Sequence, residues 1–172
     1  MTTADLIKIF QKILQVNPEA ILTGSNALTI QNIKLRRKPK DIDIHIPYGT
    51  NFNAIDGLKY IEEIIYLNDE RINRTSYLYK HEDDHVKIDI FQPTIGYIGH
   101  EPKKLICDNI TCTHFIDILT FKMQHALHLK SKSSNKHAAD LVYIFLNNTN
   151  LQSQTFGEVT ELIFGSKSAT SL

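Results

Sequence analysis

Two short segments in which acidic and branched apolar residues alternate place the strongest constraint on how this chain can fold. The first reads Asp-Ile-Asp-Ile-His-Ile over residues 41–46, and the second reads Val-Lys-Ile-Asp-Ile-Phe over residues 86–91. Side chains alternate between the two faces of a β-strand, so Asp41, Asp43 and His45 would share one face and the isoleucines between them the other. The alternation predicts two strands, each with one apolar and one acidic face.

The acidic face of these strands needs a compensating charge. Asp41 and Asp43 lie two residues apart, where their carboxylates repel each other, and a divalent cation is a natural group to offset that repulsion. If the second strand lies beside the first, Asp89 adds a third carboxylate. We therefore predict a metal site made by Asp41, Asp43 and Asp89, suited to Mg²⁺ or Mn²⁺ chemistry on phosphates. The alternative is a solvated face on an edge strand, which deters aggregation.

Length and composition limit the fold and the cellular setting. The 172 residues, 42% hydrophobic and 22% charged, are enough for one domain with a sizeable core. Acidic and basic residues balance, so the net charge does not indicate nucleic acid or membrane as a partner. Two cysteines, Cys107 and Cys112, are too few for a disulfide framework, and no apolar run is long enough to span a bilayer. We expect a cytoplasmic protein.

The remaining pattern predicts strands in the first two thirds of the chain and helices at its end. The expected helices cover residues 4–16, 54–67, 114–129, 136–146 and 157–164, and the expected strands cover residues 20–23, 41–46, 75–79, 86–91 and 105–110. Thr113 is expected to cap the helix that follows it. The predicted class is α/β (α+β), a short mixed sheet flanked by helices. We expect residues 1–112 to form a catalytic core and residues 113–172 a C-terminal helical region packed on it as one compact unit.

A Gly-Ser pair follows the first predicted strand. Gly24-Ser25 stands between the apolar run of residues 20–23 and a helix that begins near Asn26. Such a junction leaves backbone N–H groups free at a helix N-terminus, and glycine allows the backbone to approach a phosphate closely. Gly-Ser is also a common loop pair, so its meaning depends on the acids that follow.

The order of these motifs resembles that of a known superfamily. An apolar strand ending in Gly24-Ser25, the Asp-Ile-Asp segment at 41–43 and a third acid, Asp89, are similar to the pattern of nucleotidyltransferases of the DNA polymerase β type. The resemblance covers residues 20–92. It implies a nucleotidyltransferase fold and metal-dependent transfer of a nucleoside monophosphate from an NTP to a hydroxyl. The acceptor could be a small molecule, a protein or an RNA end.

The resemblance also implies roles for individual residues. Asp41 and Asp43 would bind the Mg²⁺ that carries the triphosphate, and Asp89 would complete a second metal site and help to deprotonate the acceptor. Gly24 would let the backbone approach the phosphates, and Ser25 would add a hydroxyl and an amide.

Two stretches nearer the C-terminus extend the resemblance. Residues 117–122 and 136–141 look like the acid-x-Leu-x-x-Lys and Lys-His-x-x-Asp-Leu stretches of the AbiEii-type branch. That branch includes toxins of toxin–antitoxin systems and minimal nucleotidyltransferases, so an antitoxin-like protein is an implied partner. Lys122 and Lys136 would neutralise phosphate charge. As an alternative, Lys136 and Asp140 are ordinary helix-start and capping residues.

The chain departs from the family pattern between the Gly-Ser pair and the first acids. Fifteen residues separate Ser25 from Asp41, more than is usual, and the additional stretch at residues 32–40 is basic. This stretch is a loop near the substrate that contacts phosphate, a solvated loop, or a continuation of the preceding helix. The function also has an alternative, a non-catalytic nucleotide- or partner-binding module on the same scaffold. Three acids together argue against such a module, because binding alone does not require them.

Overall fold

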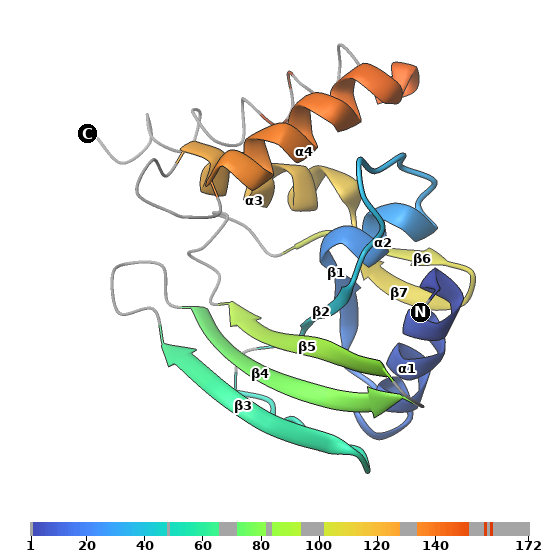
Figure 1. Ribbon diagram of the computed structural model, residues 1–172, viewed down its shortest axis with the longest axis vertical. Coiled ribbons are helices and arrows are strands. Elements are labelled where there is room, and N and C mark those ends of the chain that lie inside the picture. Colours follow the sequence, from blue (N-terminus) through green and yellow to red (C-terminus); the bar gives the residue numbers. More distant parts are fainter. Residues whose placement is uncertain are drawn as a thin grey trace.

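A mixed seven-stranded sheet forms the frame of the protein, with the strand order β3-β4-β5-β2-β1-β7-β6 (Figure 1). The computed structural model describes residues 2–47, 49–65, 72–81, 84–93, 102–127, 134–151, 157 and 159. The strands are β1 (Ile21–Thr23), β2 (Asp41–His45), β3 (Leu58–Ile65), β4 (Ile72–His81), β5 (Asp84–Pro93), β6 (Lys104–Cys107) and β7 (Ile110–Thr113). The helices are α1 (Thr3–Val16), α2 (Gly24–Ile30), α3 (Phe115–Leu127), α4 (Ser134–Asn147) and the short 3-10 helix η1 (Thr149–Leu151).

The pairing of the strands makes the sheet mixed and places β2 in its interior. β2 pairs antiparallel with β1 and parallel with β5, and β1 pairs parallel with β7. The pairs β3–β4, β4–β5 and β6–β7 are antiparallel. The predicted mixed sheet with C-terminal helices is therefore confirmed. Because β2 has a neighbour on each side, the alternative that its acids form the solvated face of an edge strand is excluded.

The alternation predicted for the two acidic strands is present. On β2, Ile42 and Ile44 are 0% exposed, while Asp41 and Asp43 are partly exposed. On β5, the apolar side chains that alternate with the polar ones are also buried: Val86, Ile88 and Ile90. The apolar faces of both strands belong to the hydrophobic core, so their opposite faces are free to form a polar site.

Helix α1 shows why the N-terminal segment is helical. Its first turn has a capping box, in which the Thr2 hydroxyl accepts a hydrogen bond from the Asp5 N–H at 3.2 Å and the Asp5 carboxylate accepts one from the Thr2 N–H at 2.8 Å. Its apolar stripe joins the core through Leu6, Ile9, Phe10 and Ile13. Capping and periodicity thus agree, and this predicted helix is confirmed.

The helix predicted over residues 54–67 is wrong. The structure has strand β3 there, which pairs with β4 along its length with one irregularity between Tyr60 and Glu62. The segment is rich in isoleucine and tyrosine, which favour strands, although its apolar spacing also fits a helix. Pairing with β4 satisfies the backbone groups of both strands, so tertiary context decides between the two.

The segment around residue 108 also differs from the prediction. The single strand expected over residues 105–110 is a hairpin of β6 and β7, and its turn residues Asp108 and Asn109 both have positive φ angles, 49° and 61°. The predicted cap at Thr113 is wrong, because Thr113 ends β7. The first helical N–H, that of Phe115, instead donates to Gln31 Oε1 at 2.9 Å.

The other expected elements agree with the structure where it describes them. The predicted hairpin is present as β4 and β5, and the predicted helices over 114–129 and 136–146 correspond to α3 and α4. The helix predicted over 157–164 lies outside the described residues except for 157 and 159. The boundary after residue 112 falls within β7, and the division into core and helical region stays a prediction. In the described ranges, no helix is long and apolar enough to cross a membrane.

The burial of β2 leads to a first prediction. Ile42→Ala removes a fully buried side chain from the centre of the sheet, and we expect it to lower the free energy of unfolding by about 2–5 kcal/mol. The control is Ile106→Ala on the edge strand β6, where the side chain is 72% exposed and the expected change is below about 1 kcal/mol. Urea unfolding measures both, and equal losses would contradict the position of β2 in the core.

Candidate active site

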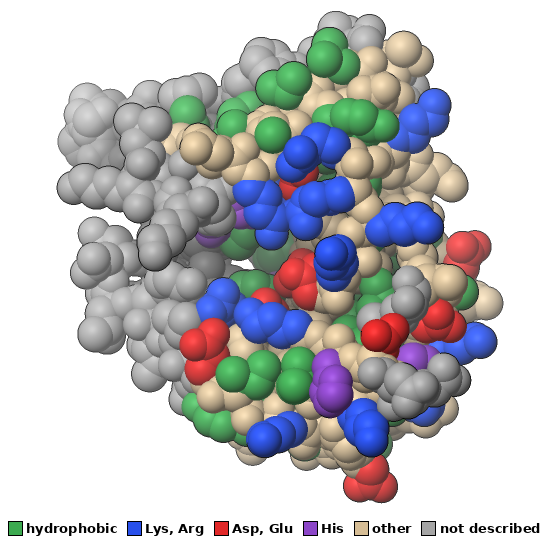
Figure 2. All heavy atoms as spheres, viewed as in Figure 1, with side chains coloured by type: hydrophobic (Ala, Val, Ile, Leu, Met, Phe, Trp, Pro, Cys, Tyr) green, Lys and Arg blue, Asp and Glu red, His purple; other side chains and the backbone are tan. Residues whose placement is uncertain are grey.

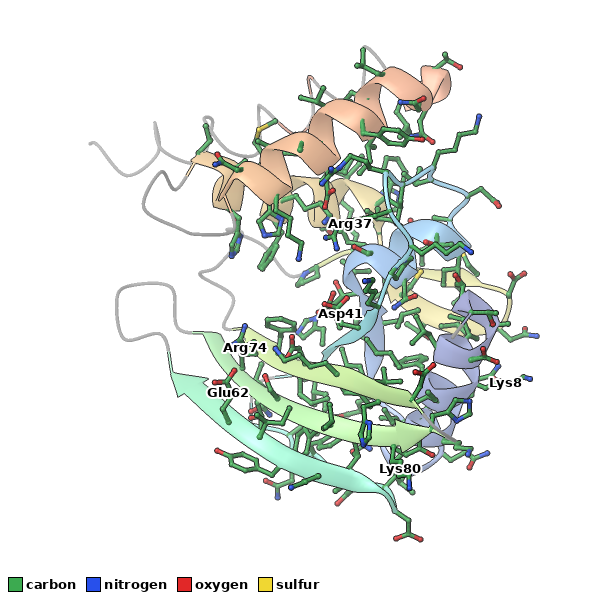
Figure 3. The ribbon with its side chains drawn as sticks, viewed as in Figure 1. Lys8, Arg37, Asp41, Glu62, Arg74 and Lys80 are labelled. Atoms are coloured by element: carbon green, nitrogen blue, oxygen red, sulfur yellow. The ribbon has the colours of Figure 1, made fainter. Side chains whose placement is uncertain are left out.

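The register between β2 and β5 brings the three predicted acids to one surface. Parallel pairing sets Asp43 opposite Asp89 and Asp41 opposite Lys87. Because residues two apart on a strand share a face, Asp41, Asp43 and Asp89 all lie on the same face of the sheet. Figure 3 shows Asp41 on the side of the sheet that faces α3 and α4. The acids predicted from the sequence are therefore neighbours in the fold.

The carboxylate of Asp43 is strongly influenced by its surroundings. Burial, together with the negative charges of Asp41 and Asp89, raises the pKa of Asp43 from 3.8 to about 7. The positive charges of Lys122 and Lys136 act in the opposite direction without cancelling that rise. Asp43 therefore holds its proton to an unusually high pH, and a cation beside it would favour the ionised form.

Gly24 packs directly against this carboxylate. The chain turns from β1 into α2 at Gly24 with a φ of +65°, a conformation that disfavours residues with a side chain. A Cβ atom at Gly24 would lie 2.7 Å from Asp43 Cγ and would overlap Oδ2 as well. Glycine is therefore required here by the acid beside it. Ser25 follows on the same turn and is partly exposed. That these two residues contact phosphate stays a prediction.

Asp89 is held by two neighbours on the sheet. Its side chain, in a residue that is 6% exposed, accepts a hydrogen bond from Ser76 Oγ on β4 and one from Lys87 Nζ at 3.0 Å. Among the residues that the structure describes, no group of three acidic, histidine or cysteine side chains is placed to hold a metal ion. Mg²⁺ commonly takes one or two carboxylates and completes its shell with water and substrate phosphate oxygens. Asp41 and Asp43 fit that donor set.

The side of the site opposite the acids is basic. Lys122 on α3 is 6% exposed, and Lys136 in the first turn of α4 is exposed. Both lie near enough to Asp43 for their charges to lower its pKa. Figure 2 shows Lys and Arg side chains gathered on the helical side of a hollow, with acidic side chains across from them. The charges of the two predicted lysines therefore act on the carboxylate of Asp43 from α3 and α4.

Asp140 on α4 connects the helices to the basic loop, which is defined here as residues 32–40. Its buried carboxylate lies 3.7 Å from Lys122 Nζ, 3.4 Å from Arg36 Nε and 3.3 Å from Arg37 Nη2. Burial alone would raise the pKa of Asp140, but the hydrogen bond from Arg37 and the charge of Lys122 hold it below its usual value. Burial lowers the pKa of Lys122, and the charge of Asp140 opposes that shift.

Several of these contacts were not predicted from the sequence. Lys87 lies two residues before Asp89, so the alternation along that strand would have placed both on one face. Ser76 carries no comparable signal, because its contact depends on the register between β4 and β5. The pairs of Arg36 and Arg37 with Asp140 join positions more than one hundred residues apart, 104 and 103 respectively. No local pattern reports such a contact.

Comparisons with known proteins give the following results. No protein-family model matches the chain, and no curated protein matches it. A crystal structure from H. pylori, provisionally named as a nucleotidyltransferase, is 15% identical over 93% of this chain and 89% of that chain, with a TM-score of 0.44. The crystal structure of JHP933 from Helicobacter pylori is 14% identical over 93% of this chain and 88% of that chain, with a TM-score of 0.45.

The contact between Gly24 and Asp43 can be tested with a matched pair of glycines. Gly24→Ala combines a strained φ with overlap on the Asp43 carboxylate, whereas Gly49→Ala has a similar φ of +83° and nothing within 4 Å. We expect Gly49→Ala to cost about 1 kcal/mol in urea unfolding, the strain alone, and Gly24→Ala to cost at least about 2 kcal/mol more. Similar losses for the two variants would show that the carboxylate does not occupy that space.

The raised pKa of Asp43 predicts a pH dependence of stability. Between about pH 4 and about pH 7 the folded protein keeps a proton that the unfolded chain has lost, so the free energy of unfolding falls as pH rises through this window. Asp43→Asn removes this titration. We expect the variant to gain on the order of 1–2 kcal/mol relative to the parent between about pH 4 and about pH 8, allowing for the partial exposure of the side chain.

Urea unfolding in EDTA at about pH 4 and at about pH 8 measures this gain in the free energy of unfolding. Asp56→Asn, at an exposed position just before β3, is the control and should keep the pH slope of the parent. If Asp43→Asn differs from the parent by the same amount at both pH values, Asp43 does not titrate in this window.

Proposed function

We propose that this protein is a metal-dependent nucleotidyltransferase that moves a nucleoside monophosphate from an NTP to a hydroxyl group. The observation that carries the proposal is the β2–β5 register, which sets Asp43 beside Asp89 with Asp41 on the same face. Lys122 and Lys136 oppose these acids electrostatically from α3 and α4. A site with carboxylates on one side and lysine side chains on the other suits a cation bound to a triphosphate.

The acids have distinct parts in this proposal. Asp41 and Asp43 would hold Mg²⁺ or Mn²⁺, which supplies charge neutralisation at the attacking and leaving oxygens when it is bound. The acceptor hydroxyl oxygen bonds to the α-phosphorus, the bond from that phosphorus to the bridging oxygen breaks, and pyrophosphate leaves. Asp89 is our candidate to receive the hydroxyl proton, and Ser76 and Lys87 fix the orientation of its carboxylate.

The opposite side of the site would act on the phosphates. Lys122 and Lys136 would offset the negative charge that grows on the leaving pyrophosphate. Gly24 would keep the Asp43 carboxylate accessible, because any larger residue would overlap it. Ser25, on the same turn, would be the adjacent contact for a phosphate oxygen.

The two C-terminal stretches support a finer assignment to the AbiEii-type branch. Lys122 belongs to the first stretch and Asp140 to the second, and their charged groups lie 3.7 Å apart. Two stretches that resemble one branch therefore meet at the same site. This assignment brings with it the proposal of a toxin-type activity with an antitoxin-like protein as partner.

Transfer from a labelled NTP tests the proposed function. With Mg²⁺, α-labelled NTPs and cell extract as the source of acceptors, we expect Asp41→Asn and Asp43→Asn each to lower transfer by at least about 100-fold, because each removes a ligand charge from the site. Asp56→Asn is the control and should retain transfer. Unchanged transfer in a variant that lacks both Asp41 and Asp43 would contradict the proposal. Calorimetric binding of Mg²⁺-ATP without transfer to any acceptor would favour the non-catalytic module.

A further inference from the structure

We propose that Arg37 of the basic loop is a triphosphate-binding residue whose guanidinium pairs with Asp140 until the substrate binds. The inference rests on the proposed function, since it names a further residue of the same site. In this arrangement the Asp140 carboxylate pairs with the Arg37 guanidinium while no phosphate is bound. A triphosphate then replaces that carboxylate as the partner of the guanidinium.

The charge around Asp140 is unbalanced. Three cationic groups, from Lys122, Arg36 and Arg37, lie within 3.7 Å of this one carboxylate. One negative charge against three positive charges leaves a surplus of two in a partly buried place. Lys136 adds a further positive charge to the same side of the site. A ligand that carries several negative charges would neutralise this surplus, and a triphosphate is such a ligand.

The contacts of the arginines with Asp140 are long and incomplete. Arg36 donates from Nε and Nη2 to the same oxygen, Oδ1, at 3.4 and 3.5 Å, and Arg37 donates from Nη2 to Oδ2 at 3.3 Å. Charge-assisted hydrogen bonds of this kind are usually about 2.7–2.9 Å long, and a guanidinium binds a carboxylate best with two parallel N–H groups. Arg37 therefore makes a single long hydrogen bond to Asp140, and its planar fork suits phosphate oxygens.

The loop backbone is fixed while the Arg37 side chain is not enclosed. Lys34 N donates to Asn148 Oδ1 at 2.8 Å, and Asn148 Nδ2 donates back to Lys34 O at 3.2 Å. At the other end of the loop, Asn26 Nδ2 donates to Asp41 O at 2.6 Å. The Arg37 side chain is 39% exposed, and Figure 3 shows it on the helical side of the space above Asp41. Rotation of the side chain alone can therefore exchange its partner.

The geometry selects Arg37 over Arg36. Arg37 and Lys122 both approach Oδ2 of Asp140, whereas Arg36 approaches Oδ1. Arg37 lies close enough to Lys122 for its charge to lower the pKa of that lysine, and the charge of Lys122 acts in turn on Asp43. Arg37 is thus the arginine on the side of the acids.

Binding of inorganic tripolyphosphate in EDTA tests this inference separately from transfer, because it needs neither a metal nor an acceptor. By calorimetry we expect Arg37→Gln to weaken binding about tenfold, the loss of one hydrogen bond between charged groups. Arg36→Gln is the matched control, since it contacts the same carboxylate and its side chain is 46% exposed, and we expect a change below about twofold. Arg37→Lys keeps the charge without the fork and should lie between these values.

The variant Asp140→Asn distinguishes competition between Asp140 and phosphate from a purely structural role of Asp140. If Asp140 competes with phosphate, removing its charge should tighten tripolyphosphate binding, whereas a purely structural role would weaken it. Equal weakening in Arg36→Gln and Arg37→Gln, or no binding by the parent, would overturn the inference. The arginine variants decide the matter if Asp140→Asn does not fold. If tripolyphosphate binding depends on Arg37 but no NTP transfer occurs, only the proposed function is contradicted. If transfer occurs but tripolyphosphate binding does not depend on Arg37, only this inference is contradicted.

Discussion

The parallel pairing of β2 with β5 is the interaction on which both the fold and the candidate site depend. One face of the pair buries Ile42, Ile44 and their β5 counterparts, and the other carries the acids. Since side chains alternate with a period of two, a slip of one residue along either strand would bury carboxylates and expose isoleucines. Hydrophobic burial therefore fixes the register, and the register fixes which acids are neighbours. In this protein the stability of the sheet and the geometry of the site have a single cause.

The same arrangement concentrates unfavourable charge, and the surrounding structure limits its effects. Burial, together with the negative charges of Asp41 and Asp89, raises the pKa of Asp43 to about 7. Asp89 has direct hydrogen-bond partners in Ser76 and Lys87. On the helical side, the carboxylate of Asp140 partly neutralises three positive charges, those of Lys122, Arg36 and Arg37. The folded protein thus holds two groups of like charges facing each other, an arrangement that a metal-bound triphosphate would relieve on both sides at once.

The parts of the fold that could be predicted are those in which local pattern and tertiary context agree. The alternation on residues 41–46 could be predicted because burial of its isoleucines and exposure of its acids both fit one strand. Residues 58–65 could not, because their apolar spacing fits a helix and only pairing with β4 decides otherwise. The contact of Arg37 with Asp140 depends on how α4 packs against the basic loop, which is information that no local pattern contains.

In the proposed site, Asp41 and Asp43 bind the metal of a triphosphate whose phosphates face Lys122. A crystal structure with Mn²⁺ and a non-hydrolysable NTP tests it most directly, because anomalous scattering locates the cation without reference to the refined ligand. We expect a Mn²⁺ peak within bonding distance of both carboxylates, with the phosphates between it and the helices α3 and α4. A nucleotide bound elsewhere, or a cation that contacts neither Asp41 nor Asp43, would contradict it.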